Sequence, residues 1–164
     1  MVSQSERATT ATESQFRINY PNSVSRKSIV LSLDDRGHSI IKDLHTMEWV
    51  GAKFYSLRSK GPVTGDTLVT LETPEGVQVE LSKVLDTADV VVMVATAGVA
   101  AESVNAVGEH CFERSIMTNG FVLDSGDNPA ELNKTLRAVR PWVISLVTGS
   151  DQDYLIEALR SIRA

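Results

Sequence analysis

Hydrophobic and polar positions change their period several times along this chain, and each change marks an expected element. From Ser28 the run SIVLSL is aliphatic and β-branched, which is typical of a buried strand. Apolar residues then recur at helical spacing over residues 40–50, with Ser39 as the expected N-cap and Gly51 as the stop. Residues 52–57 form the next apolar run. This order predicts a strand, a helix and a second strand parallel to the first.

The next segment departs from this alternation. Residues 67–81 contain two alternating runs on either side of a Pro-Glu-Gly turn, which predicts a β-hairpin. We expect this hairpin at an edge of the sheet, because Pro74 has no N–H to donate to a strand partner.

Strands and helices alternate again through the rest of the chain. The patterns predict a helix over 82–87, a strand over 89–96, a helix opened by Gly98, a strand over 121–123, a helix from Pro129, a strand over 142–147 and a last helix capped by Ser150 or Asp151. We therefore predict an α/β fold, a three-layer α/β/α sandwich with a doubly wound, mostly parallel sheet and an added β-hairpin. Its strand order is either Rossmann-like or flavodoxin-like. The expected centre of the core is Val90, Val91, Val92, Val94, Ile144 and Leu146.

The domain organisation follows from a shift in composition. Residues 1–26 are rich in Ser, Thr, Gln and charge, so they are expected to form a flexible N-terminal tail, followed by a single α/β domain over 27–164. Within the tail, Phe16, Ile18 and Tyr20 alternate with polar residues. That apolar row is suited to docking on the domain or on a second subunit.

Charge and composition narrow the classes of partner. With 16 basic and 21 acidic side chains the net charge is -5, which disfavours a nucleic-acid partner. No apolar run approaches the ~20 residues that a membrane-spanning helix needs, so no membrane partner is expected. One cysteine, Cys111, permits no disulfide within the chain. The N-terminal stretch is polar and contains Glu6 and Glu13, which points to a cytoplasmic protein.

The sequence lacks the motifs of several common enzyme and nucleotide-binding families. The chain has no GxxxxGK[ST] phosphate loop, no GxGxxG fingerprint and no GxSxG nucleophile elbow. His110 and Cys111 are adjacent on an expected helix, so their side chains diverge and make a poor metal pair. We expect no metal site, and no particular cofactor is indicated.

A candidate site lies where the parallel strands end, because ligands of open α/β sheets bind at the carboxyl ends of the strands. The helices that follow direct their N-terminal N–H groups to the same rim, which favours an anion. Arg36 is the expected direct partner of that anion. The expected ligand-binding residues are Arg36, Gly37, Thr96, Gly98, Ser125, Thr148, Gly149 and Ser150.

Three carboxylates at the same rim oppose this interpretation. If Asp34, Asp35 and Asp124 dominate the local field, the site prefers a cation or a metal-bridged phosphate. Asp35 and His38 are the candidates for general acid–base chemistry, because a carboxylate beside an imidazole can move a proton near neutral pH.

The sequence thus favours a small-ligand-binding α/β domain, with a nucleotide or a phosphorylated or carboxylated metabolite as its anionic ligand. The alternative is a non-catalytic interaction or regulatory module that self-associates through its hairpin edge and tail. A homodimer is expected because an exposed edge strand invites pairing with a second copy. Whether the domain is an enzyme stays open.

Overall fold

The computed structural model describes residues 26–58, 69–162 and 164, and within these residues seven strands form one sheet in the order β4-β3-β2-β1-β5-β6-β7. Five strands run parallel to one another, and a short antiparallel hairpin extends the sheet beyond the second of them. The parallel strands are β1 (Ser28–Ser32), β2 (Ala52–Leu57), β5 (Val90–Thr96), β6 (Met117–Leu123) and β7 (Ser145–Gly149); the hairpin is β3 (Thr70–Glu72) and β4 (Gln78–Glu80).

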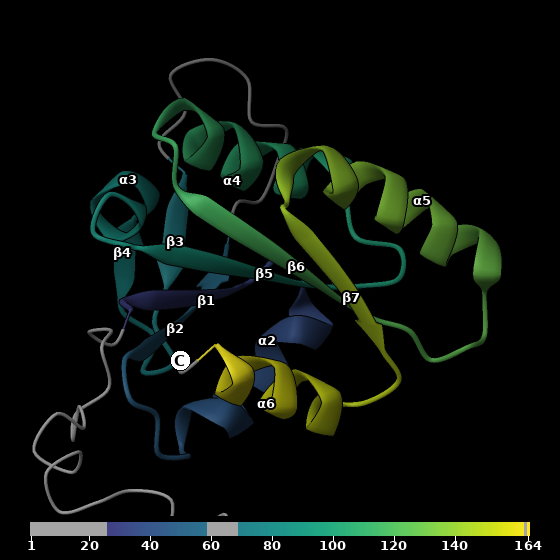
Figure 1. Cartoon of the computed structure of the whole chain (residues 1–164), viewed down its shortest axis with the longest axis horizontal. Coiled ribbons are helices and arrows are strands. Elements are labelled where there is room, and N and C mark those ends of the chain that lie inside the picture. Colours follow the sequence, from purple (N-terminus) through teal and green to yellow (C-terminus); the bar gives the residue numbers. More distant parts are fainter. Residues whose placement is uncertain (1–25, 59–68, 163) are drawn as a thin grey trace, which may run out of the picture.

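Helices cover both faces of the sheet, as Figure 1 shows. One face carries α2 (Asp35–His45) and α6 (Gln152–Ser161). The other carries α3 (Leu81–Leu85), α4 (Ala101–Glu113) and α5 (Pro129–Val139), followed by the 3-10 turn Arg140–Trp142. Each face has its own cluster of buried apolar side chains. The expected three-layer α/β/α sandwich is confirmed.

The order of the parallel strands settles which doubly wound arrangement this is. Along the sheet they run β2, β1, β5, β6 and β7, which is the flavodoxin-like order rather than the Rossmann-like one. The winding reverses between β1 and β5, because the chain moves to one side for β2 and to the other side for the later strands. The predicted hairpin also lies at an edge of the sheet.

The core is centred on β5, as the run of valines predicted, and all seven of its residues are buried. The prediction that Ile144 belongs to this core is wrong, because its exposed fraction is 69%. Leu146 is half-buried. The physical reason is the position of β7 at the outer edge of the sheet, where it has a neighbour on one side only among the described residues. Ile144 itself precedes the strand, which begins at Ser145 rather than at residue 142.

Other boundaries also differ from the expectation, including that of β6, which begins at Met117 rather than at residue 121. α2 begins at Asp35, so residues 35–38 lie in its first turn rather than in a loop, and Asp34 rather than Ser39 is the N-cap. It ends at His45 instead of continuing to Gly51. Gly98 does not open α4; it lies in a turn three residues before that helix, with a φ of +97°.

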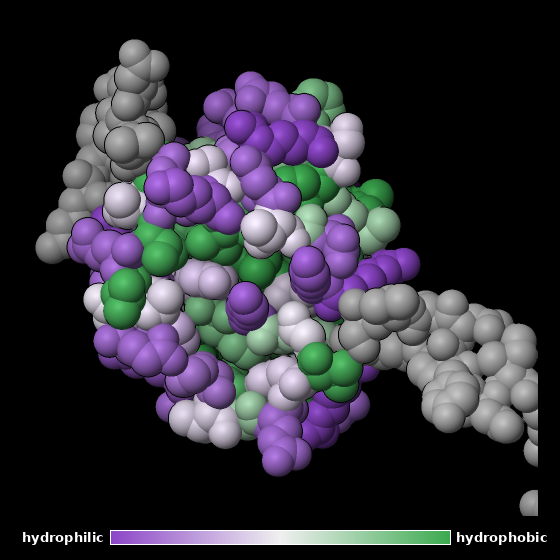
Figure 2. Space-filling model, turned by 90° about the vertical axis from the view of Figure 1, so that its left-hand side faces the viewer, coloured by the Kyte–Doolittle hydropathy of each residue, from purple (hydrophilic) through white to green (hydrophobic). Residues whose placement is uncertain are grey.

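The surface carries both hydrophilic and hydrophobic residues. On the face turned to the viewer in Figure 2, hydrophilic residues interrupt the apolar ones. Within the described part of the chain, no helix is both long and apolar enough to cross a membrane.

Candidate functional site

The carboxyl-terminal ends of the strands are joined to one another by hydrogen bonds. Asp34, after β1, accepts a hydrogen bond from the backbone N–H of Thr96 at the end of β5. The N–H of Ala97 donates to the carbonyl of Leu123 in β6, and Asp124 N–H donates to the carbonyl of Gly149 in β7. The rim is therefore a continuous row of loops, as the parallel arrangement predicts.

Asp34 holds the first two of these loops together. One carboxylate oxygen accepts from the N–H of Gly37 at 2.7 Å and caps α2. The other accepts from the N–H of Thr96 at 2.7 Å and from its hydroxyl at 3.1 Å. Because three donors already surround this carboxylate, its negative charge is largely compensated within the protein.

A cavity of about 310 Å³ opens at this point of the rim, between the ends of β1 and β5. This is where the winding of the sheet reverses, which is the common ligand position in doubly wound folds. Its walls come from the loop after β1, the end of β2 and the turn that leads into α4. The lining residues are Leu33, Asp34, Asp35, Leu57, Arg58, Thr96, Ala97, Gly98, Val99, Ala100 and Ser103.

Among the described residues that line this cavity, Arg58 is the cation. Its guanidinium forms a two-point ion pair with Glu72, with nitrogen–oxygen distances of 3.1 and 3.3 Å. It also contacts the carboxylate of Asp35 at 3.3 Å and Nε2 of His38 at 3.0 Å. The Asp35 side chain is 99% exposed, so this contact is the one that a ligand can replace at least cost.

His38 lies in the first turn of α2, and its side chain is buried. Its Nδ1 lies 2.5 Å from the hydroxyl of Ser56, and its Nε2 faces Arg58. Because the guanidinium only donates, Nε2 accepts and Nδ1 carries the proton of a neutral ring. Burial, together with the positive charges of Arg58 and Lys42, lowers the pKa of His38. Arg58 contacts both Asp35 and His38, the two candidates for acid–base chemistry.

This arrangement predicts a pH dependence of stability. Because the pKa of His38 in the folded chain lies below its ordinary value of 6.5, the unfolded chain binds more protons in the interval between the two. The free energy of unfolding should then fall as the pH is lowered through 6.5 toward the folded-state pKa. In urea unfolding across this range, the free energy of unfolding of His38→Gln should depend less on pH than that of the parent chain. An unchanged slope in that variant would contradict the assignment of a neutral, buried His38.

The start of α4 differs from the starts of the other long helices. Side chains cap α2, α5 and α6, through Asp34, Asn128 and Asp151 respectively. The N-cap of α4 is Ala100, which offers no side-chain hydrogen bond. The first helical bond joins the N–H of Ser103 to the Ala100 carbonyl at 3.1 Å, so the preceding N–H groups lack acceptors within the helix.

The turn before α4 is held against α5, and a Cβ on Gly98 would lie 3.5 Å from the Glu131 carboxylate. Gly98 has a φ of +97°, a conformation that other residues adopt only with strain. Its N–H donates to the hydroxyl of Thr135 in α5 at 2.9 Å, which fixes the turn. The uncapped end of α4 thus faces the cavity that Ala100 and Ser103 help to line.

The predicted site residues are distributed over the whole rim rather than gathered at the cavity. Thr96 and Gly98 line it, whereas Arg36 is exposed on α2 outside its lining. Gly37 is buried in the first turn of α2. The others lie farther along the rim, in the loop after β6 and at the end of β7: Ser125, Thr148, Gly149 and Ser150. Sequence reasoning missed Arg58, whose partner Glu72 is 14 positions away.

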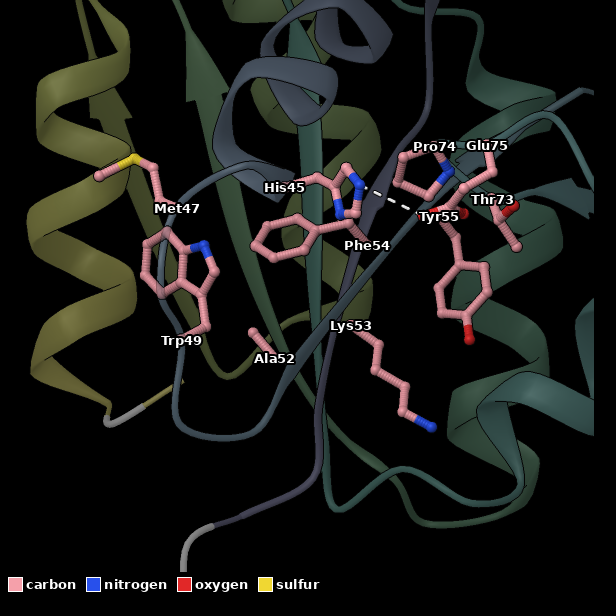
Figure 3. A pocket seen from close by; sticks show the side chains of 10 residues that line it. All are labelled: His45, Met47, Trp49, Ala52, Lys53, Phe54, Tyr55, Thr73, Pro74 and Glu75. Carbon is pink, nitrogen blue, oxygen red and sulfur yellow. Dashed lines mark ion pairs between the residues drawn. The ribbon is translucent and has the colours of Figure 1, made fainter.

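A second cavity of about 310 Å³ lies at the opposite end of β2, shown in Figure 3. The His45 imidazole and the Glu75 carboxylate face each other across it at 3.2 Å. Trp49 and Phe54 line its wall, with ring centroids 5.6 Å apart. His45 and Glu75 already contact each other, and Lys53 also lines this cavity.

Neither of these two cavities contains a reactive cysteine or a cluster of metal ligands among its described lining residues. Cys111 is buried in the core, and this burial raises the pKa of its thiol to about 12, so it is a small apolar residue rather than a nucleophile. Across residues 26–58 and 69–162, no group of three or more His, Cys, Asp or Glu side chains is placed to hold a metal ion.

The fold and the rim define an α/β domain of flavodoxin-like strand order with a cavity at its switch point. No family model matches the chain, and no curated protein does. One similar solved structure is the NMR structure of the apo-form of the flavoprotein from Lactobacillus acidophilus NCFM. It has 10% sequence identity, covers 80% of this chain and 97% of its own, and has a TM-score of 0.49. This degree of likeness carries no information about a ligand of the present chain.

Proposed function

We propose that this chain is a small-ligand-binding domain whose ligand carries an anionic group, as in a nucleotide or a phosphorylated or carboxylated metabolite. The anionic group sits in the cavity between β1 and β5, at the start of α4. The observation that carries the proposal is the uncapped N-terminus of α4 in the wall of that cavity. Backbone N–H groups and the helix dipole at such an end favour a negative charge.

The charges around the cavity are compatible with an anion, although carboxylates outnumber cations there. Asp34 is compensated by its three donors, and Glu72 by Arg58. Asp35 is fully exposed and contacts Arg58 through one pair of atoms only. A ligand phosphate or carboxylate replaces Asp35 at the guanidinium, and this exchange leaves the ion pair with Glu72 in place.

A thermal-shift screen of nucleotides, sugar phosphates and dicarboxylates tests this proposal. A ligand at a hundred times its dissociation constant stabilises the folded state by about 2.7 kcal/mol. For a chain of 164 residues this stabilisation raises the melting temperature by roughly 5–10 °C. Ser103→Asp places a carboxylate in the cavity wall, where it repels an anion, and should abolish the shift.

Ser103→Asp should weaken binding of the anionic ligand without destabilising the fold. An acidic residue in the first turn of a helix is favourable to the helix, so Ser103→Asp should melt at or above the temperature of the parent chain. The matched control is Gln152→Glu, which adds the same charge to the first turn of α6 on the opposite face of the sheet. It should keep the full shift. A ligand that shifts both variants equally binds elsewhere, and the proposal is then wrong.

The alternative function, self-association through the hairpin, has less support than ligand binding at the rim. The outer hairpin strand, β4, has three residues and includes Gln78 and Glu80. Short, polar edge strands resist pairing with other chains. A homodimer stays a prediction, and the other edge of the sheet, β7, is the more apolar one.

A further inference from the structure

β7 lies at an outer edge of the sheet, where another strand can add to it. Among the residues that the structure describes, β7 pairs only with β6, so its other side presents unpaired backbone groups. Val147 is 43% exposed on this strand, and Tyr154 is 58% exposed on the first turn of α6 beside it. A cavity of about 130 Å³ lies under the same edge. Its lining includes Ser145 and Val147 of β7 and Leu155, Leu159 and Ile162 at α6.

We propose that this edge is covered by the chain's own N-terminal segment, with residues 16–20 added to β7 as an antiparallel strand. The direction follows from topology. The segment leads into the start of β1, and β7 runs parallel to β1, so a segment lying beside β7 on its way to that start runs opposite to it. Arg26 already points toward β6, with its guanidinium 3.8 Å from the sulfur of Met117.

The length of the connection fits this placement. The new strand would be four strand spacings from β1, which is about 19 Å at ~4.8 Å each. Ser145 is level with Val30, because Val30 pairs with Val92, Val92 with Asn119 and Asn119 with Ser145. From Lys27 this adds roughly 10 Å along the strand direction, for a total span of about 22 Å. The seven steps from residue 20 to residue 27 reach about 23–25 Å when extended.

The side-chain pattern fits as well. With Tyr20 opposite Ser145, Ile18 falls opposite Val147 and Phe16 opposite Gly149. Directly opposed residues of paired strands share a face, so these apolar side chains all lie on the α6 side, over the exposed Val147 and its cavity. The Tyr154 ring packs close to Gly149, where Phe16 would meet it.

The polar residues of the segment support the same register. Arg17 and Asn19 would point to the other face of the sheet. Pro21, which has no N–H to donate, follows directly where the added strand ends. The proposal thus accounts for the alternation of apolar residues in a segment that is otherwise polar.

Hydrogen exchange in the full chain tests the proposal through a matched pair of variants. Ile18→Asp places a charge against Val147, whereas Asn19→Asp places the same charge on the opposite face. Ile18→Asp should raise the exchange rates of the outward-pointing amides in residues 145–149 by about tenfold or more, and Asn19→Asp should leave them unchanged. Equal exchange in both variants and the parent overturns the proposal.

A cross-linking measurement distinguishes the chain's own segment from that of a second copy. In the double variant Ile18→Cys with Val147→Cys, mild oxidation of dilute protein should give a disulfide within one chain. The control pair Arg17→Cys with Val147→Cys should form it at least about tenfold less, because its side chains lie on opposite faces. A covalent dimer as the main product, or equal yields in the two pairs, contradicts the proposal.

Discussion

Leu31→Ala should lower the free energy of unfolding by about 2–5 kcal/mol. Leu31 lies in β1, which has neighbours on both sides, and its side chain is fully buried in the cluster beneath α3, α4 and α5. Truncation removes apolar contacts and leaves a cavity that surrounding strands, fixed by their hydrogen bonds, cannot close.

Urea unfolding followed by circular dichroism measures this loss. Val50→Ala is the matched control, because Val50 is 72% exposed and outside the core. A surface change of this kind should alter the free energy of unfolding by less than about 0.5 kcal/mol. Equal losses in the two variants would contradict the assignment of β1 to the centre of the sheet.

Gly108→Ala should destabilise the chain by about 1–3 kcal/mol, although the same change within a helix is normally favourable by up to ~1 kcal/mol. A Cβ on Gly108 would lie 2.3 Å from Cγ and 2.8 Å from Cβ of Trp142. The Trp142 ring cannot move aside freely, because its N–H donates to Asn105 at 3.1 Å and Phe112 packs against it edge to face.

A double-mutant cycle isolates this contact. When Trp142→Ala is already present, adding Gly108→Ala should become neutral or stabilising, since only the helix propensity of alanine remains. Thermal or urea unfolding of the four chains gives the coupling. If Gly108→Ala costs the same in both backgrounds, the close approach of α4 to Trp142 is not its cause.

The fold was largely predictable because its strongest signals are local. The valine run of β5 and the aliphatic run of β1 predict buried parallel strands by themselves, and Pro74 predicts the edge hairpin. Strand order is not local, which is why Ile144 was assigned to the core: the same residues suit a central strand and an edge strand equally well.

The start of α2 was misplaced for a similar reason. A start at Ser39 leaves Gly37 outside the helix, in keeping with the low helix propensity of glycine. Its role depends on a contact between elements: an added Cβ would lie 3.1 Å from Cβ of Ser32 and 3.2 Å from the Asp34 carboxylate. Glycine permits α2 to approach β1 this closely, and the pattern of residues 34–39 does not reveal such an approach.

The rim was predicted as the location of the site, but the cation in its wall was not. Arg36 is near the acidic residues in sequence, whereas Arg58 comes from the end of β2 and is oriented by Glu72 and His38. Its place in the cavity depends on β2 and β3 lying side by side. Such a residue becomes recognisable only when the strand order is known.

An NMR titration of the full chain with inorganic phosphate tests the central claim most directly. If the uncapped start of α4 receives the anionic group of the ligand, the amide signals of Gly98 and residues 101–103 should move and saturate together. In Ser103→Asp the same signals should stay in place, while Gln152→Glu behaves as the parent chain does. Saturable shifts elsewhere with none at the start of α4, or no saturable shifts at all, would contradict the account.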